Sequence, residues 1–257
     1  MSLVGPAWAV ADLRVGNGKL SFDLIGLAGT VHRLMTERPL GWRVLITPNL
    51  YHLRLLRHDP QLMEQYQRAE MILPDGWPVA AMLSRTTGTQ VERVAGSDLL
   101  ECLLGTRVQG RPLVLVGGRG HTELEVLSAR AANSGWVVHT EPAPAEEVDD
   151  PTTRAMLLKR IASSGNTGIV VLGLGAPKQE QFALELAALP GSGYILCLGM
   201  AINFSAGAAE RAPRWVQRMN LEWAHRMLQE PKRLGPRYAS DLRSFLPLFV
   251  QNYRGRA

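Results

Sequence analysis

Three polar clusters each follow a short apolar run in this sequence, and their residue types could bind or activate a substrate. They are Thr47-Pro48-Asn49, Pro74-Asp75-Gly76, and the segment G-L-G-A-P-K-Q-E from Gly173 to Glu180. In open α/β sheets, ligands bind beyond the carboxyl ends of the strands. If the apolar runs are strands of one sheet, the three clusters lie together in one site.

The carboxylate of Asp75 is suited to general base catalysis. It is placed to take a proton from a substrate hydroxyl, and Gly76 beside it lets the backbone bend closely. The alternative is a structural role, as the cap of a helix over residues 77–84 or in a plain turn, and spacing alone favours it. Thr47 and Asn49 leave the same alternatives open, because a helix is expected to begin directly after them.

The glycine-containing segment has the features of a phosphate or diphosphate cradle. Gly173 and Gly175 allow close approach, Pro177 suits the start of a helix, and Lys178 adds positive charge at a helix N-terminus, where anions are already favoured. The segment matches neither the Walker A motif nor the G-x-G-x-x-G fingerprint. ATP hydrolysis and NAD binding are therefore poorly supported.

Arg93, in the segment E-R-V-A-G-S-D, is a further candidate for phosphate binding. Its planar guanidinium can hold two phosphate oxygens, or it can pair with the nearby Glu92 or Asp98. Neither the two cysteines nor the six scattered histidines have the spacing of a metal site. We therefore expect no metal and no bound cofactor.

Six apolar runs, separated by amphipathic stretches, predict the elements that would position these residues. The order predicts an α/β, Rossmann-like fold whose mostly parallel sheet has helices on both faces. The acidic, proline-containing residues 141–150 are predicted to form a loop, with a helix beginning at Asp150-Pro151. The predicted strands cover residues 43–47, 71–73, 112–116, 136–139, 168–173 and 194–198.

The charge distribution divides the chain near residue 211. Residues 211–257 carry ten Arg or Lys against three acids, a net charge of +7, which leaves −2 for residues 1–210. We interpret residues 1–210 as the catalytic domain and residues 211–257 as a basic appendage. Such asymmetry indicates an acidic partner for the appendage: a phosphorylated ligand, anionic lipid headgroups or nucleic acid.

The appendage is predicted to contain two amphipathic helices, over residues 213–229 and 240–253, separated by the breakers Pro231, Gly235 and Pro236. Their apolar faces could pack on the core or another subunit, or lie on a bilayer surface. No run approaches the roughly 18 to 20 apolar residues that cross a membrane, and residues 1–30 lack the plan of a signal peptide. A cytoplasmic location is therefore expected.

Taken together, five motifs resemble the WecG/TagA/CpsF glycosyltransferases, in the order found in that family, over roughly residues 40–235. Any one of them alone is weak evidence. They are T-P-N at 47–49, L-P-D-G-W-P at 73–78, E-R-V-A-G-S-D at 92–98, G-L-G-A-P-K-Q-E at 173–180, and R-A-P-R-W-V-Q-R-M-N-L-E-W-A-H-R-M-L-Q-E-P-K-R at 211–233.

The resemblance implies an inverting, metal-independent transferase at the inner face of the cytoplasmic membrane. It would move a sugar from a UDP-sugar to an undecaprenyl-diphosphate-linked sugar during synthesis of cell-surface polysaccharide or teichoic acid. Asp75 matches the family's proposed general base. Thr47, Asn49, Arg93 and Gln179 match its polar residues that bind the donor and position the transferred sugar.

In the family, the appendage closes over the site and contacts the anionic membrane surface, and self-association through surfaces that the appendage also covers is expected. Without a metal, cationic side chains must meet the charge that develops on the UDP leaving group. The sequence departs from the family at Asn203, where an acid is common, so the donor could be N-acetylmannosamine, its uronic acid or glucose. The candidates for diphosphate contact are Arg214, Arg218, Arg226 and Arg233.

The alternative function is a non-catalytic module that binds anionic lipid or nucleic acid through the basic appendage. Asp75, Asn49 and Arg93 together disfavour it, because a pure binder needs no carboxylate directed into a basic site. We therefore expect an enzyme, with no nucleic-acid partner.

Overall fold

The computed structural model describes residues 8–118, 120–207, 212, 213, 216, 222–229 and 231–253, except for the side chains at 223, 226 and 233. Six parallel strands form the main sheet, in the order β4-β3-β8-β7-β5-β6. All six predicted strands are confirmed. They are β3 (Trp42–Ile46), β4 (Met71–Ile72), β5 (Pro112–Gly117), β6 (Val137–Glu141), β7 (Gly168–Gly173) and β8 (Gly193–Cys197).

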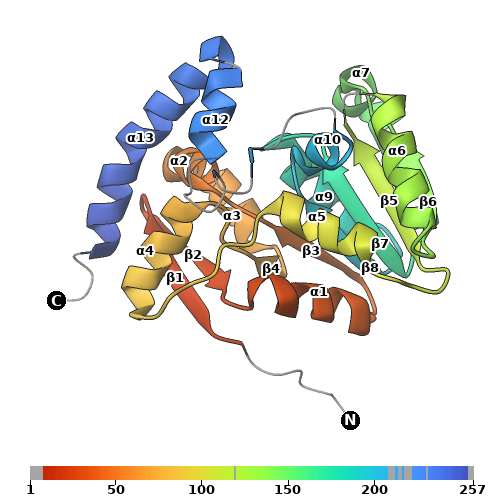
Figure 1. The fold of residues 1–257 in the computed structure, drawn as a ribbon, viewed down its shortest axis with the longest axis horizontal. Coiled ribbons are helices and arrows are strands. Elements are labelled where there is room, and N and C mark those ends of the chain that lie inside the picture. Colours follow the sequence, from red (N-terminus) through yellow and green to blue (C-terminus); the bar gives the residue numbers. More distant parts are fainter. Residues whose placement is uncertain are drawn as a thin grey trace.

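Helices cover both faces of this sheet, as expected for the α/β, Rossmann-like fold (Figure 1). Residues of α1 (Gly26–Thr36), α5 (Gly96–Gly105), α6 (His121–Ala132) and α10 (Ala201–Ser205) pack on one face. The other face is covered by α2 (Leu50–His58), α3 (Pro60–Gln67), α4 (Trp77–Thr87), α8 (Pro151–Gly165) and α9 (Lys178–Ala187).

The central strands are apolar at every position because each of their faces is buried. In β7, Ile169 and Val171 belong to one core cluster, whereas Val170 and Leu172 belong to the cluster on the opposite face. All four side chains are fully buried. This continuous apolar pattern is typical of parallel strands between two helical layers.

A two-stranded antiparallel hairpin precedes the main sheet and was not predicted. It consists of β1 (Val10–Val15) and β2 (Gly18–Asp23), joined by Gly16 and Asn17. Gly16 has a φ of +60°, and a Cβ there would lie 2.6 Å from the backbone oxygen of Arg57. A two-residue Gly-Asn connection between alternating apolar segments is a recognised hairpin signal, so the sequence did contain the information.

Two predicted segments differ in the structure. The predicted loop over residues 141–150 contains a short helix, α7 (Ala145–Asp149), whose Val148 is buried and anchors it to the core. The predicted helix break at Pro231–Pro236 is confirmed only at its start: α12 (Glu222–Gln229) ends before Pro231, but α13 (Pro231–Tyr253) begins there and continues through Gly235 and Pro236. Proline is tolerated in the first turn of a helix, which accounts for Pro231. Pro236 lies inside α13, where the burial of Leu234 and Leu248 supports the continuous helix.

Helix α13 is held against the rest of the protein by side-chain hydrogen bonds at two positions along its length. Near its middle, the buried Asp241 accepts a 2.7 Å hydrogen bond from Nε of Arg54 on α2. At its C-terminal end, the side-chain amide of Asn252 bonds both backbone groups of Arg14 on β1, at 2.7 and 2.9 Å. The appendage therefore rests on α2 and on the hairpin, with α12 (Glu222–Gln229) beside it (Figure 1).

Candidate active site

The predicted site residues meet at the carboxyl ends of β3 and β4 because backbone hydrogen bonds join their loops. The N–H of Asp75 donates to the carbonyl of Pro48 at 3.1 Å, which holds the loop after β4 against the loop after β3. The N–H of Val94 donates to the carbonyl of Pro74 at 2.8 Å. Asn49, Asp75 and Arg93 therefore lie in three loops that form one unit.

Asp75 has the properties of a general base. It does not cap α4, because Gly76 occupies the N-cap with a φ of +77° and no side-chain cap hydrogen bond is present. Burial raises the pKa of Asp75 to about 6, against the opposing charge of Arg93. A carboxylate that titrates near neutral pH is well matched to taking a proton from a hydroxyl group. The purely structural interpretation as a helix cap is wrong.

Asn49 has both of the roles that the sequence left open. Its Oδ1 accepts the N–H of Tyr51 at 3.1 Å, so it caps α2. Its side chain also lies beside the carboxylate of Asp75 and lowers the pKa of that group by stabilising the ionised form. The helix cap thus fixes the position of a polar group beside the candidate base.

Arg93 reaches across to the appendage. Its Nη1 lies 3.7 Å from Oε2 of Glu222, the first residue of α12, and both side chains are about three-quarters buried. Glu92 points elsewhere, accepting the N–H of Leu27. The guanidinium and the two carboxylates of Asp75 and Glu222 form a mixed-charge cluster, in which the charge of Glu222 raises the pKa of Asp75.

Thr47 and Gln179 join the site to the neighbouring strands. The Thr47 hydroxyl donates to the carbonyl of Cys197 at 3.4 Å, linking the end of β3 to β8. Gln179 is buried, and its Oε1 accepts the N–H of Gly199 at 3.1 Å while its Nε2 donates to Glu180 at 2.9 Å. These two residues hold the turn after β8 in place.

The remaining residues of the glycine-containing segment behave differently from one another. A Cβ at Gly173 would lie 2.8 Å from Cδ1 of Ile202, so this glycine permits close packing of α10. Gly175 has a φ of +82° and open space around it, which suits the approach of a ligand. Lys178 is exposed, and its Nζ contacts both carboxylate oxygens of Asp149 at 2.6 and 2.9 Å.

The predicted diphosphate contacts cannot be placed in the site. Arg214 and Arg218 lie outside the described residues, as do the side chains of Arg226 and Arg233. Among the described residues, no three His, Cys, Asp or Glu side chains group in a way that could hold a metal ion.

The order of motifs and the geometry above agree with a comparison to known protein families. The model of the glycosyl transferase WecG/TagA/CpsF family matches residues 16–257, nearly the whole sequence. The chain belongs to this family. It is a UDP-sugar-dependent glycosyltransferase, and the family's role is sugar transfer in the synthesis of cell-surface polysaccharides. The match also extends into the hairpin, where no family motif was recognised.

Three further residues of this glycosyltransferase contribute to the site and were not predicted as site residues. Glu222 approaches Arg93. His52 contacts Asn49, and Glu180 contacts Gln179. His52 had a detectable signal, since it occupies the third helical position after the Asn49 cap, where a reciprocal capping partner is common. The position of Glu222 depends on how the appendage folds back, and no local pattern encodes that.

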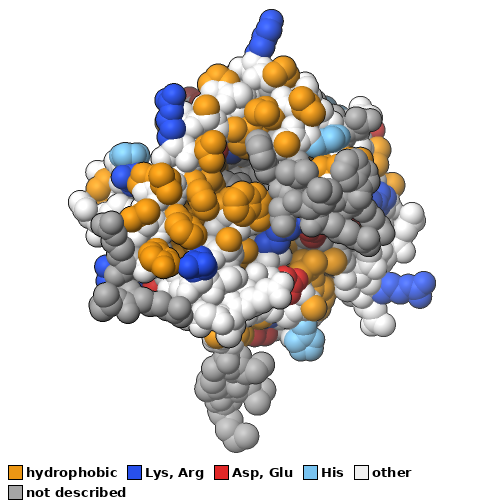
Figure 2. All heavy atoms as spheres, turned by 60° about the vertical axis from the view of Figure 1, so that its left-hand side comes forward, with side chains coloured by type: hydrophobic (Ala, Val, Ile, Leu, Met, Phe, Trp, Pro, Cys, Tyr) orange, Lys and Arg blue, Asp and Glu red, His pale blue; other side chains and the backbone are white. Residues whose placement is uncertain are grey.

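The helices of the appendage leave an apolar surface uncovered. Figure 2, which turns this side of the protein forward, shows hydrophobic side chains gathered across it. On α13, Leu242, Leu246 and Tyr253 are 60–70% exposed, and we call them the α13 stripe. Phe245 beside them packs on Trp77 of α4, with ring centroids 5.7 Å apart. In the described residues, no helix is both long and apolar enough to cross a membrane.

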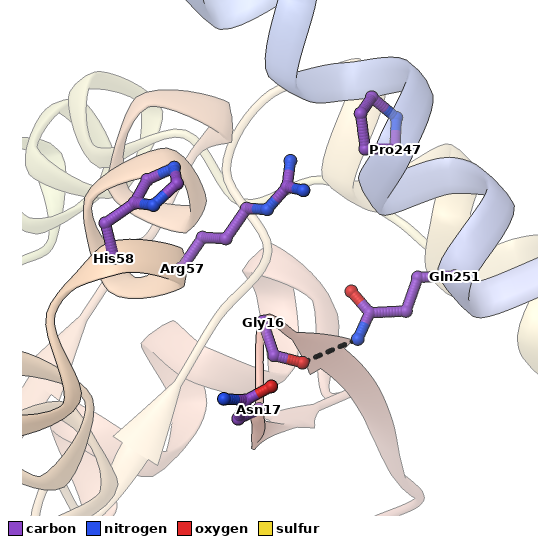
Figure 3. A pocket seen from close by; sticks show the side chains of 6 residues that line it. All are labelled: Gly16, Asn17, Arg57, His58, Pro247 and Gln251. Atoms are coloured by element: carbon purple, nitrogen blue, oxygen red, sulfur yellow. Dashed lines mark hydrogen bonds between the residues drawn. The ribbon is translucent and has the colours of Figure 1, made fainter.

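A pocket of about 400 Å³ lies between α13, the end of α2 and the hairpin, and it is separate from the candidate active site around Asp75 (Figure 3). In Figure 3, Arg57 extends toward Pro247, and Gln251 bonds the carbonyl of Gly16. None of the predicted site residues lines it. Because α2 has nine residues, its last residue lies about 12 Å from its first, and only the first end adjoins Asp75. The lining residues are Gly16, Asn17, Arg57, His58, Pro247 and Gln251.

Proposed function

We propose that this glycosyltransferase moves one sugar from a UDP-sugar to a polyprenyl-diphosphate-linked sugar, with inversion and without a metal ion. The observation that carries the proposal is Asp75, whose pKa is raised to about 6 beside Asn49 and Arg93 at the ends of β3 and β4. A base that is ionised at neutral pH, yet can still hold a proton, fits the activation of an acceptor hydroxyl.

In this mechanism, Asp75 takes the proton of the acceptor hydroxyl as that oxygen attacks the anomeric carbon of the donor. The bond between the anomeric carbon and the β-phosphate oxygen breaks, and UDP leaves with the bonding electrons. Attack from the face opposite to UDP inverts the anomeric centre. Arg93 and the arginines of the appendage would stabilise the negative charge on the leaving diphosphate, the kind of electrostatic contribution that dominates many transfer reactions.

We also propose that the enzyme works at the inner face of the membrane, held there by its appendage. The α13 stripe supports this, because three large apolar side chains are exposed side by side on a helix that belongs to a basic segment. Apolar side chains can enter the interface while Arg and Lys meet lipid phosphates. The alternative is that the α13 stripe forms a contact between two copies of the chain.

The first test measures transfer from a panel of radiolabelled UDP-sugars to a synthetic polyprenyl-diphosphate N-acetylglucosamine, with and without EDTA. N-acetylmannosamine, its uronic acid and glucose are the donors to compare. We expect product that resists EDTA and is lost about 10²-fold or more in Asp75→Asn. Asp12→Asn is the matched control, since Asp12 forms an exposed ion pair with Lys19 on the hairpin.

Each outcome has a distinct meaning. Loss of product on adding EDTA would contradict a metal-independent reaction. Near-normal transfer by Asp75→Asn would remove Asp75 as the base. If no donor gives product, but RNA binds in a salt-sensitive manner, the chain is a binding module rather than a transferase of this kind.

A further inference from the structure

A chain of polar side chains, all buried except the half-buried Asn49, adjoins the candidate active site. It begins at Asn49, the cap of α2, and ends at Gln179, whose Oε1 accepts the N–H of Gly199. His52 and Glu180 lie between these two, with only 10% and 5% of their side chains exposed. Because burial of polar groups is costly unless they are bonded, such a chain points to a specific role.

Two of the three links of this chain are within hydrogen-bond distance, and the link between His52 and Glu180 is a longer contact. His52 Nδ1 lies 3.0 Å from Asn49 N and 2.8 Å from Asn49 Oδ1. His52 Nε2 lies 3.7 Å from Glu180 Oε1, which also accepts a 2.9 Å hydrogen bond from Gln179 Nε2. The two residues thus connect a side chain from the loop after β3 to one at the start of α9.

Each neutral tautomer of His52 makes one of its two contacts with Asn49 a hydrogen bond. With the proton on Nε2, Nδ1 accepts the N–H of Asn49 and Nε2 points its proton at Glu180. With the proton on Nδ1, that atom donates to Asn49 Oδ1, and Nε2 faces Glu180 as an acceptor. Burial and the charge of Arg237 lower the pKa of His52 to about 3, so the ring stays neutral at physiological pH. Burial likewise raises the pKa of Glu180.

The orientation of the Asn49 side chain matters because its amide oxygen and its amide nitrogen face different groups. Its Oδ1 accepts the N–H of Tyr51, which leaves the amide nitrogen for the Asp75 carboxylate. An asparagine free to rotate would lose this interaction part of the time. His52 contacts both the backbone and the side chain of Asn49 and restricts that rotation.

We propose that His52 and Glu180 are positioning residues of this enzyme, which hold the Asn49 amide on Asp75 and tie it through Gln179 to the turn after β8. The inference rests on the proposed function, in which Asp75 is the general base. The groups that face Asp75 are Asn49, Arg93 and Glu222. The titratable groups that face His52 are Tyr51, Tyr66, Glu180 and Arg237.

The test compares the pH dependence of kcat/KM for transfer in variants of the full chain. His52→Phe keeps the ring but removes both nitrogens, and Glu180→Leu removes the carboxylate. Both variants should lower kcat about tenfold. They should also move the acid limb of the kcat/KM profile to higher pH, by up to about one unit. The acid limb moves to higher pH because Asp75 loses an interaction that stabilises its ionised form, which raises its pKa.

Two variants serve as controls for this test. Glu180→Gln keeps a group able to bond both His52 and Gln179, so it should restore most of the activity and the wild-type limb. Glu185→Leu makes the matching change on the same helix, at a residue paired with Arg154 at 3.4 Å, and should leave the limb unchanged. If His52→Phe does not fold, His52→Asn, which keeps a polar atom near the Nδ1 position, should fold and give an intermediate shift.

A second readout does not need the enzymatic reaction. The carboxyl ¹³C signal of Asp75, assigned by its absence in Asp75→Asn, gives the pKa of this group directly. We expect a higher pKa in His52→Phe than in wild type. A lower melting temperature with an unchanged Asp75 pKa would make His52 and Glu180 merely structural and overturn the inference. Lack of transfer by the wild-type enzyme would instead contradict the proposed function, while this titration would still decide the inference.

Discussion

Oε2 of Glu222 lies 3.7 Å from Nη1 of Arg93, so the appendage places an acid against the guanidinium that adjoins the candidate base. Arg93 lowers the pKa of Asp75 and Glu222 raises it. The appendage therefore influences the ionisation of Asp75. A diphosphate that binds Arg93 would have to compete with the carboxylate of Glu222.

Replacing Glu222 should shift the pH profile of the enzyme. In Glu222→Gln, the charge that disfavours ionised Asp75 is gone, so the pKa of Asp75 falls. The acid limb of kcat/KM should move to lower pH by roughly half a unit or more, and the shift should shrink at high salt. A profile identical to wild type at low salt would show that Glu222 is too well screened to act on Asp75.

Asp75 should reduce the stability of the fold above its own pKa. Its pKa of about 6 in the folded protein exceeds the ordinary value of 3.8 for this carboxyl group. The folded state therefore binds more protons than the unfolded chain between these pH values, and stability falls as pH rises through this window. Asp75→Asn should therefore raise the free energy of unfolding by about 1–3 kcal/mol at pH 7.5. Urea denaturation at pH 7.5 and pH 4 measures this, and a gain of equal size at both pH values would contradict it.

The contact between Arg54 and Asp241 should hold the appendage on α2. The side chain of Asp241 is only 6% exposed, and Asp241→Ala would leave Arg54 without its partner. We expect a loss of about 2–4 kcal/mol in the free energy of unfolding and faster proteolysis within α13. Asp12→Ala breaks an exposed pair with Lys19 and should cost less than about 1 kcal/mol. Equal losses in the two variants would argue against this anchor.

The α13 stripe should be needed for binding to lipid. The double variant Leu242→Glu and Leu246→Glu replaces two exposed apolar side chains with charges and should weaken binding to anionic phospholipid vesicles at least about tenfold. Met156→Glu is the control, because Met156 is 59% exposed on α8. Sedimentation with vesicles measures the binding. Unchanged binding of the double variant would direct attention to self-association, which analytical ultracentrifugation would detect.

The sheet could be predicted because each of its strands is encoded by a short continuous stretch of the sequence. Each central strand is a short apolar run that ends in a polar or glycine-containing cluster, as at Ile46 and Leu172. The hairpin carried the Gly16-Asn17 signal. The continuity of α13 through Pro236 could not be predicted from local propensity, because it depends on the burial of Leu234 and on the contact of Asp241 with Arg54 of α2, both of which arise from tertiary packing.

The site could be predicted only in part, for a related reason. Asn49 and Asp75 follow strands β3 and β4 of one sheet, so their convergence follows from the fold, whereas Arg93 lies between α4 and α5 and is brought to them by the hydrogen bond from Val94 to Pro74. The choice between cap and base for Asp75 required its surroundings, since Gly76 occupies the cap position. The approach of Glu222 arises from the packing of helices far apart in the sequence, which one sequence does not encode in any short pattern.

The amide of Asn252 has a consequence for the solubility of the chain. By bonding the N–H and the carbonyl of Arg14, it occupies backbone groups on the outer edge of β1 that another strand could otherwise use. Unpaired strand edges are templates for pairing between molecules. A version of the enzyme cut before α13 would therefore lose the proposed membrane contact and also expose a β-edge. Aggregation of such a truncated protein would then reflect an uncapped strand rather than misfolding of the catalytic domain.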